Sequence, residues 1–269
     1  DMAGPLLLVG CGKMGGALLE GWLGRGVPPD GIKVIEPAAA DAARRHGVAV
    51  VTEAAALPAG FAPEVLVLAV KPQVMEQATA PLAHFARPGA VVLSIAAGKT
   101  IAGFATRFGA AAAIVRAMPN TPAAVGRGIT VACANAAVSP ALRQRCDALL
   151  AAVGEVAWVE DEALLDAVTA VSGSGPAYVF LLIECLAGAG VAAGLAPALA
   201  ARLARATVCG AGELAFRSPE TAAILRQNVT SPGGTTQAAL NVLMAPGGLQ
   251  PLLTEAVLSA MRRSRELAG

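Results

Sequence analysis

The chain has 269 residues and a net charge of +1, with 14% charged and 3% aromatic side chains. This length suits about two domains, and the lack of a basic stripe and of stacking aromatics argues against nucleic acid as the main partner. The two histidines, His46 and His84, form no ligand-spaced pair, so we predict neither a metal site nor a histidine base.

Short apolar runs alternate with helical patterns over residues 1–160. Continuous β-branched runs separated by helices indicate a mostly parallel sheet that is covered on both faces. We therefore predict an α/β, doubly wound, Rossmann-type domain over this part of the chain. Ser139 and Pro140 are expected to begin a helix that ends near Gly154. The expected strands are 6–9, 32–35, 48–51, 65–70, 91–95, 113–115, 129–133 and 156–159.

Strand patterns stop after about residue 160, and we predict an all-helical second domain over residues 161–269. Over residues 167–201 only Glu184 is charged, which superficially resembles a membrane span. The 173–176 segment and Pro197 break this stretch. We therefore expect no membrane contact, but a helical dimerisation domain buried against another subunit of an obligate homo-oligomer. The expected helices are 176–190, 197–216, 219–227, 235–244 and 249–261.

The five cysteines are scattered and include no C-x-x-C pair. They are typical of small core residues in a reducing compartment rather than of disulfides or zinc ligands. No basic stretch precedes an apolar one near the N-terminus, so no signal peptide is predicted. These patterns together predict a cytoplasmic protein.

A G-x-G-x-x-G motif follows the first expected strand and opens the first expected helix. In this context it is a dinucleotide fingerprint: the first glycine permits the tight turn, the second lets the pyrophosphate approach, and the third lets helix and strand pack closely. The alternative is a glycine-rich turn without a ligand. The residues predicted to bind the cofactor here are Gly10, Gly12, Lys13, Met14 and Gly15.

Glu36 ends the second expected strand, where an acidic side chain accepts hydrogen bonds from the adenosine ribose hydroxyls. A carboxylate repels a 2′-phosphate, so Glu36 favours NADH over NADPH. Arg44 and Arg45 are close in sequence and can weaken this preference, although such arginines are more often a solvated helix face.

Further cofactor contacts are predicted where later strands end, because ligands of such sheets bind outside the carboxyl ends of the strands. Pro72 ends the fourth strand region, and small residues surround Ala96 after the fifth. Asn120 follows the sixth strand and can bond a nicotinamide carboxamide or a substrate; the alternative is a turn residue that satisfies local backbone. For Lys71 the alternative is an ordinary surface lysine. The predicted contacts are Ala69, Val70, Lys71, Pro72, Ala96 and Asn120.

The segment V-T-S-P-G-G-T-T at 229–236 stands directly before an apolar helical run. Its hydroxyls and backbone N–H groups cluster at a helix N-terminus, where anions bind well. Because the segment carries no formal charge, it would hold a ligand by dipoles and hydrogen bonds. The alternative is a helix cap with a turn.

With the S-G-S-G-P-A-Y motif at 172–178, these segments make the chain resemble the pyrroline-5-carboxylate reductase family over essentially its full length. The resemblance implies NAD(P)H-dependent reduction of 1-pyrroline-5-carboxylate, a cyclic imino acid, to proline, the last step of proline synthesis. It also implies an active site at the interface of a homodimer with intertwined helical domains, and dimers that assemble further into rings. At the end of the second strand the family commonly has Asn, Ser or Arg, which suit NADPH. This chain has Glu36 and Pro37 there instead.

Thr236 occupies the position that, in the family, hydrogen-bonds the imine nitrogen, which makes it the candidate catalytic residue. A protonated imine already carries its positive charge, so an orienting hydroxyl and positioning against the cofactor suffice without a strong acid. A helix cap is the other interpretation of Thr236. The predicted substrate-binding residues are Ser231, Gly233, Gly234, Thr235 and Thr236.

Two other functions stay open. The first is a reductase of the same architecture that acts on another cyclic imine or on a β-hydroxy acid. β-Hydroxy acid dehydrogenases normally carry a catalytic lysine in the second domain, and Lys99 is the last lysine here. The second is a non-catalytic dinucleotide sensor, which the hydroxyl cluster at 231–236 disfavours.

Overall fold

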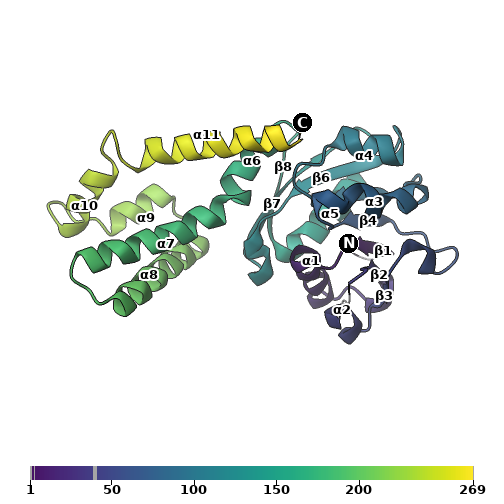
Figure 1. Cartoon of the computed structure of the whole chain (residues 1–269), viewed down its shortest axis with the longest axis horizontal. Helices are drawn as coiled ribbons and strands as arrows, with labels where there is room; N and C mark the ends of the chain where they lie inside the picture. The colour runs from purple at the N-terminus through teal and green to yellow at the C-terminus, as the bar shows by residue number, and fades with distance from the viewer. Residues whose placement is uncertain (1, 3, 39–40, 269) are drawn as a thin grey trace. The chain divides into compact units, whose positions relative to one another are not determined.

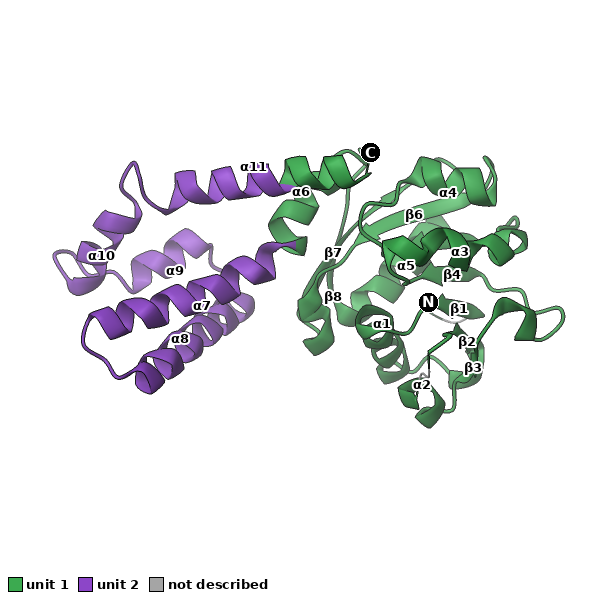
Figure 2. Cartoon of the chain, in the orientation of Figure 1, with its two compact units in different colours: residues 1–173, 261–269 green, residues 174–260 purple. Residues whose placement is uncertain are grey.

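The structure, a computed structural model, describes residues 2, 4–38 and 41–268. Figure 1 shows the elements in chain order. They form two compact units, which Figure 2 colours separately. The first unit comprises residues 1–173 and 261–269, and the helical unit comprises residues 174–260.

The first unit is built on one eight-stranded sheet, counted over the described residues, in the order β3-β2-β1-β4-β5-β6-β7-β8. Neighbouring strands are parallel except for the β6–β7 pair, which is antiparallel. The strand order reverses between β1 and β4, and this is the switch point at which ligands of such sheets bind. The strands are β1 (Leu6–Val9), β2 (Ile32–Ile35), β3 (Ala49–Val51), β4 (Val65–Leu68), β5 (Val91–Ser94), β6 (Ala113–Met118), β7 (Gly128–Ala134) and β8 (Gly154–Trp158).

Helices cover both faces of this sheet, which confirms the predicted doubly wound α/β class. Short 3-10 turns, η1 to η6, lie in the connections between the strands and helices. The helices of the first unit are α1 (Lys13–Gly24), α2 (Asp41–Arg45), α3 (Met75–Thr79), α4 (Ile101–Phe108), α5 (Pro140–Leu150) and α6 (Leu164–Val168), followed by the π-helical turn η7 (Thr169–Gly173).

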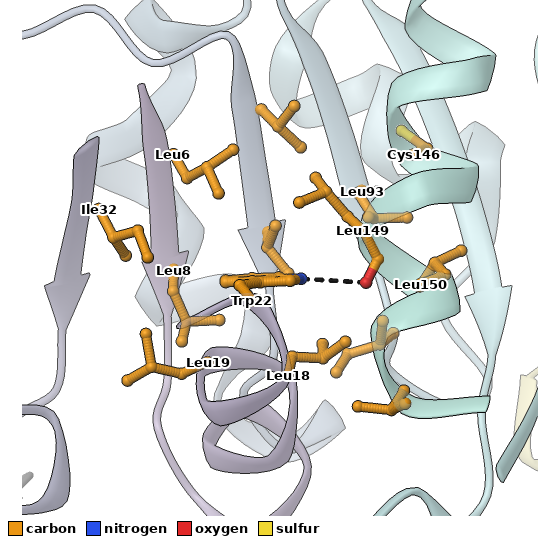
Figure 3. Close-up of a cluster of buried hydrophobic side chains, with 14 of the residues drawn as sticks. Leu6, Leu8, Leu18, Leu19, Trp22, Ile32, Leu93, Cys146, Leu149 and Leu150 are labelled. Carbon is orange, nitrogen blue, oxygen red and sulfur yellow. Dashed lines mark hydrogen bonds between the residues drawn. The ribbon is translucent and has the colours of Figure 1, made fainter. Parts of the chain in front are cut away.

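Two apolar clusters hold the sheet, one on each face. Successive residues of a strand point to opposite faces, so Leu6 and Leu8 of β1 enter one cluster while Leu7 and Val9 enter the other. In the first cluster Trp22 of α1 is fully buried, and its indole Nε1 donates to the Leu149 carbonyl of α5 at 3.0 Å (Figure 3). This bond satisfies a buried polar group and fixes α1, which begins at the glycine motif.

Several strands differ in their bounds from the sequence prediction, and two of the differences bear on the candidate cofactor residues. β6 continues to Met118 because Arg116, which interrupts the apolar run, is 6% exposed and paired with Glu162 at 2.9 Å. β4 ends at Leu68 rather than at Val70, although the run is apolar throughout. Ala69 and Val70 therefore lie just beyond the strand, at the carboxyl edge of the sheet.

The helical unit starts at Ser174, where the chain bends. Pro176 and Pro197 stand in the first turns of α7 and α8, where a missing N–H costs no helical hydrogen bond. Thr221 caps α9 by accepting from the Ile224 N–H at 3.3 Å. The helices are α7 (Gly175–Ala192), α8 (Pro197–Arg217), α9 (Ala222–Asn228), α10 (Thr235–Leu243) and α11 (Leu249–Ala268), whose last residues belong to the first unit.

Few apolar side chains of the helical unit are buried within the chain. Ala200 and Ala204 of α8 are 2% exposed each, whereas Phe180 of α7 is 62% exposed. Among the described residues one helical run, Leu164–Ala192, is long and apolar enough to cross a membrane by length and composition. The run contains η7 and Pro176. Leu165 near its start is buried against Val131 and Cys133, and α7 packs on α8, but much of the apolar surface of α7 is exposed.

Candidate cofactor and substrate sites

The glycine motif forms the turn between β1 and α1. Gly10 has φ +92°, a backbone region that favours glycine, and an added Cβ would lie 2.8 Å from the Ala69 carbonyl oxygen. A Cβ on Gly15 would clash with the Gly10 carbonyl oxygen. These two glycines therefore have the turn-forming and packing roles that the fingerprint predicts.

Gly12 differs from both, because no atom lies within 4 Å of a Cβ added there. It is the N-cap of α1 and provides no side-chain cap, and the first N–H to bond within the helix is that of Gly16, to the Gly12 carbonyl at 2.8 Å. The preceding N–H groups, including those of Lys13 and Met14, have no acceptor within the helix. Open space beside exposed N–H donors suits a pyrophosphate, so the residues fit a dinucleotide.

Glu36 lies beside this turn and is half-buried. Its Oε1 accepts from the Cys11 N–H at 3.0 Å and its Oε2 accepts from the Ala38 N–H at 3.1 Å. The carboxylate is thereby fixed between the end of β2 and the glycine turn. Burial raises the pKa of the Cys11 thiol, and the carboxylates of Glu36 and Glu20 raise it further. The thiol therefore stays neutral and adds no negative charge beside the pyrophosphate position.

The remaining predicted cofactor residues of the first unit lie along the same carboxyl edge. Ala69 and Val70 follow β4, and the Ala69 N–H donates to the Val9 carbonyl at 2.8 Å. Lys71 is exposed and precedes Pro72, the first residue of the turn η3 (Pro72–Val74). Ala96 follows β5 and is buried, with its N–H bonded to Ser94 Oγ at 3.2 Å. Cofactor binding by these residues stays a prediction.

Asn120 follows β6, but both halves of its side-chain amide already have partners within the first unit. Its Oδ1 accepts from the Ile129 N–H at 2.9 Å, and its Nδ2 donates to the Ser172 carbonyl at 3.0 Å. This arrangement favours a structural role for the amide over the predicted contact with nicotinamide.

The sequence prediction missed Glu162. Its Oε2 accepts from Arg116 Nη1 at 2.9 Å and from the Ile101 N–H, at the start of α4, also at 2.9 Å. Glu162 thus joins the strand that leads to Asn120 with the helix that follows β5. The signal was the charge of Arg116 within an apolar strand, since a buried charge needs a partner.

The 231–236 segment of the helical unit forms a turn at the N-terminus of α10. Gly233 has φ +70°, and the Gly234 N–H donates to the Ser231 carbonyl at 3.0 Å. The Gly234 N–H is therefore used by the turn, contrary to its predicted role as a carboxylate donor. Gly234 is the N-cap of α10 and no side chain caps this helix, so the N–H groups of Thr235 and Thr236 stay available.

Thr236 is half-buried in the second position of α10. Within the described residues its hydroxyl makes no hydrogen bond, and α10 lacks a side-chain cap, which argues against the cap interpretation. A short hydroxyl beside free helix N-terminal donors can hold a carboxylate and an adjacent nitrogen without any formal charge.

The two units are thus a doubly wound sheet with a glycine turn whose residues fit a dinucleotide, and an all-helical unit in which α10 begins without a side-chain cap. They define the class of NAD(P)-dependent oxidoreductases. A family model described as NADP oxidoreductase coenzyme F420-dependent matches residues 6–98, and one described as pyrroline-5-carboxylate reductase dimerisation matches residues 162–267.

Curated relatives and solved structures agree. A pyrroline-5-carboxylate reductase of Pseudomonas aeruginosa is 41% identical over 98% of this chain and 96% of its own length. One from Synechocystis is 50% identical over 76% of this chain and 75% of its own length. The solved enzyme of Coxiella burnetii covers 99% of both chains with a TM-score of 0.91 and 34% identity. That of Plasmodium falciparum, solved with NADP bound, covers 98% of both with a TM-score of 0.80 and 27% identity. The chain belongs to the pyrroline-5-carboxylate reductase family.

Proposed function

We propose that this protein reduces 1-pyrroline-5-carboxylate to L-proline with NADH or NADPH, as the last step of proline synthesis. The observation that carries the proposal is the identity to a curated reductase across 98% of the chain. The segment expected to bind the substrate also has free donors: the half-buried Thr236 hydroxyl and the N–H groups at the start of α10.

Different residues of the 231–236 segment bind the substrate carboxylate and orient the ring nitrogen. The cofactor, when bound, supplies the hydride that forms the new C–H bond at the imine carbon. The Ser231 hydroxyl and the N–H groups of Gly233, Thr235 and Thr236 bind the substrate carboxylate. The Thr236 hydroxyl bonds the ring nitrogen, which already carries its proton and becomes the amine of proline. Because the iminium is charged before reaction, catalysis requires positioning and no strong acid.

An assay that mixes the protein, NADH and pyrroline-5-carboxylate tests the proposal. We expect loss of nicotinamide absorbance and formation of one proline for each NADH consumed. The six-membered homologue of the substrate is assayed in parallel. Faster turnover of this homologue would indicate that the enzyme acts on another cyclic imine. Binding of NADH without turnover of any imine would contradict the proposal and favour the dinucleotide sensor.

Glu36 is proposed to give NADH the advantage over NADPH. Its fixed carboxylate stands where the adenosine ribose is expected, so a 2′-phosphate would face like charge. We expect kcat/KM to be about tenfold higher with NADH, which corresponds to about 1.4 kcal/mol. Glu36→Gln keeps an oxygen that can accept the Cys11 N–H and should lessen the ratio. Equal efficiencies with the two cofactors in the wild type would contradict this role.

We further propose a cytoplasmic homodimer with intertwined helical units, which assembles further into a ring. The dimerisation match over residues 162–267 and the exposed apolar surface of α7 support the dimer. We attribute that surface to the subunit interface and not to a membrane. The five cysteines are free, which suits a reducing compartment.

A further inference from the structure

The helix that leads from α6 into α7 is widened at η7 (Thr169–Gly173), a π-helical turn. Two hydroxyls bond carbonyls in this region: Thr169 Oγ1 donates to the Leu165 carbonyl at 2.8 Å and Ser172 Oγ donates to the Val168 carbonyl at 3.1 Å. Single π-helical turns within helices are frequent at functional sites. The turn also lies where the chain passes from the first unit to the helical unit, after Gly173.

The carbonyl of Ser172 lacks the backbone hydrogen-bond donor that an α-helix would normally supply. In an α-helix it would accept from the N–H of residue 176, which is Pro176 and has no N–H. The ring of a proline also pushes away the carbonyl four residues earlier. Asn120 Nδ2 supplies the missing donor at 3.0 Å from the Ser172 oxygen.

Asn120 is itself held firmly. Its Oδ1 accepts from the Ile129 N–H at the start of β7, 2.9 Å away. Two residues earlier, the Met118 methyl lies against Gly173, since a Cβ added to Gly173 would be 2.6 Å from that methyl. Met118 at the end of β6 and Asn120 just after it therefore contact two successive residues of the π-turn, Gly173 and Ser172.

We propose that Asn120 is a positioning residue for the reduction, which acts through the Ser172 carbonyl and contacts neither cofactor nor substrate. It ties the carboxyl edge of the sheet to the backbone from which the helical unit continues at Ser174. This inference rests on the proposed function, because it assigns cofactor binding to that edge and substrate binding to the helical unit. Loss of the bond leaves the Ser172 carbonyl without its donor and loosens the backbone that leads to the substrate-binding residues.

Asn135 offers a matched control. It lies at the opposite end of the β6–β7 pair, and its side chain bridges backbone in the same way. Its Oδ1 accepts from the Ile114 N–H at 3.1 Å and its Nδ2 donates to the Ala112 carbonyl at 2.8 Å. It has no contact with the π-turn among its hydrogen bonds.

The test compares Asn120→Asp with Asn135→Asp in the full chain. Each substitution keeps the acceptor and replaces the donor with a second carboxylate oxygen. We expect faster hydrogen exchange over residues 169–178 in Asn120→Asp alone. In that variant kcat/KM for pyrroline-5-carboxylate should fall by about tenfold or more, with an unchanged dissociation constant for NADH. Asn135→Asp should lose thermal stability without this kinetic loss.

Weaker NADH binding in Asn120→Asp, by the same factor as kcat/KM, would overturn the proposal in favour of direct contact with the cofactor. Equal kinetic losses in the two variants, or faster exchange with normal kinetics, would overturn it as well. If Asn120→Asp does not fold, Asn120→Ala and Asn135→Ala provide the same comparison without an added charge. The exchange measurement needs no substrate, so failure of the proposed reduction would be seen separately, in the wild-type assay.

Discussion

Gly15→Ala is expected to lower the free energy of unfolding by about 3 kcal/mol, because its new methyl group would overlap the Gly10 carbonyl oxygen. Both atoms belong to backbone that is fixed between β1 and α1, so neither moves away easily. Thermal or urea unfolding measures the loss. Gly16→Ala is the control, since the next residue of the same helix has open space at its Cβ and should become slightly more stable.

Gly12→Ala should separate cofactor binding from folding. The added methyl group meets no protein atom, so unfolding should stay as in the wild type. It would occupy the space that the pyrophosphate needs, and the dissociation constant for NADH, measured by fluorescence titration, should rise by about tenfold or more. Normal NADH binding in Gly12→Ala would contradict the placement of the pyrophosphate at this turn.

The sequence predicted most of the sheet because buried parallel strands are continuous apolar runs, and each of the expected runs contains a strand. It did not predict the direction of β7. A run of apolar residues carries no direction, and the clue lay in the connection: only a short 3-10 turn, Thr121–Val125, joins β6 to β7. Parallel neighbours need a crossover of a dozen or more residues, usually helical.

The same distinction applies to the candidate site: features set by residues close in sequence were predictable, and contacts between residues far apart in sequence were not. The glycine turn was predictable because its steric demands act within six residues of chain and on the strand beside it. Asn120 was assigned to the cofactor because it follows a strand, but its partner Ser172 is 52 residues away. The bond between Arg116 and Glu162 spans 46 residues. Pairs of this kind are set by the packing of the sheet, which spacing in the sequence does not show.

Thr236→Ala is expected to reduce kcat about tenfold to a hundredfold, because one transition-state hydrogen bond of about 1.5–3 kcal/mol is lost. The structure makes this variant unusually easy to interpret. Within the described residues the Thr236 hydroxyl bonds no other group, and α10 has no side-chain cap. The melting temperature should therefore stay close to that of the wild type, so that a loss of turnover reports on the reaction and not on folding.

Thr236→Ser and Thr236→Val complete the test. Serine keeps the hydroxyl and should retain most of the turnover, whereas valine keeps the shape of threonine and should resemble alanine. If Thr236→Val turns over pyrroline-5-carboxylate as fast as the wild type, the hydroxyl does not bond the ring nitrogen. A rise in KM alone, with kcat unchanged, would place Thr236 at the carboxylate only, because an interaction made equally in ground state and transition state does not alter kcat.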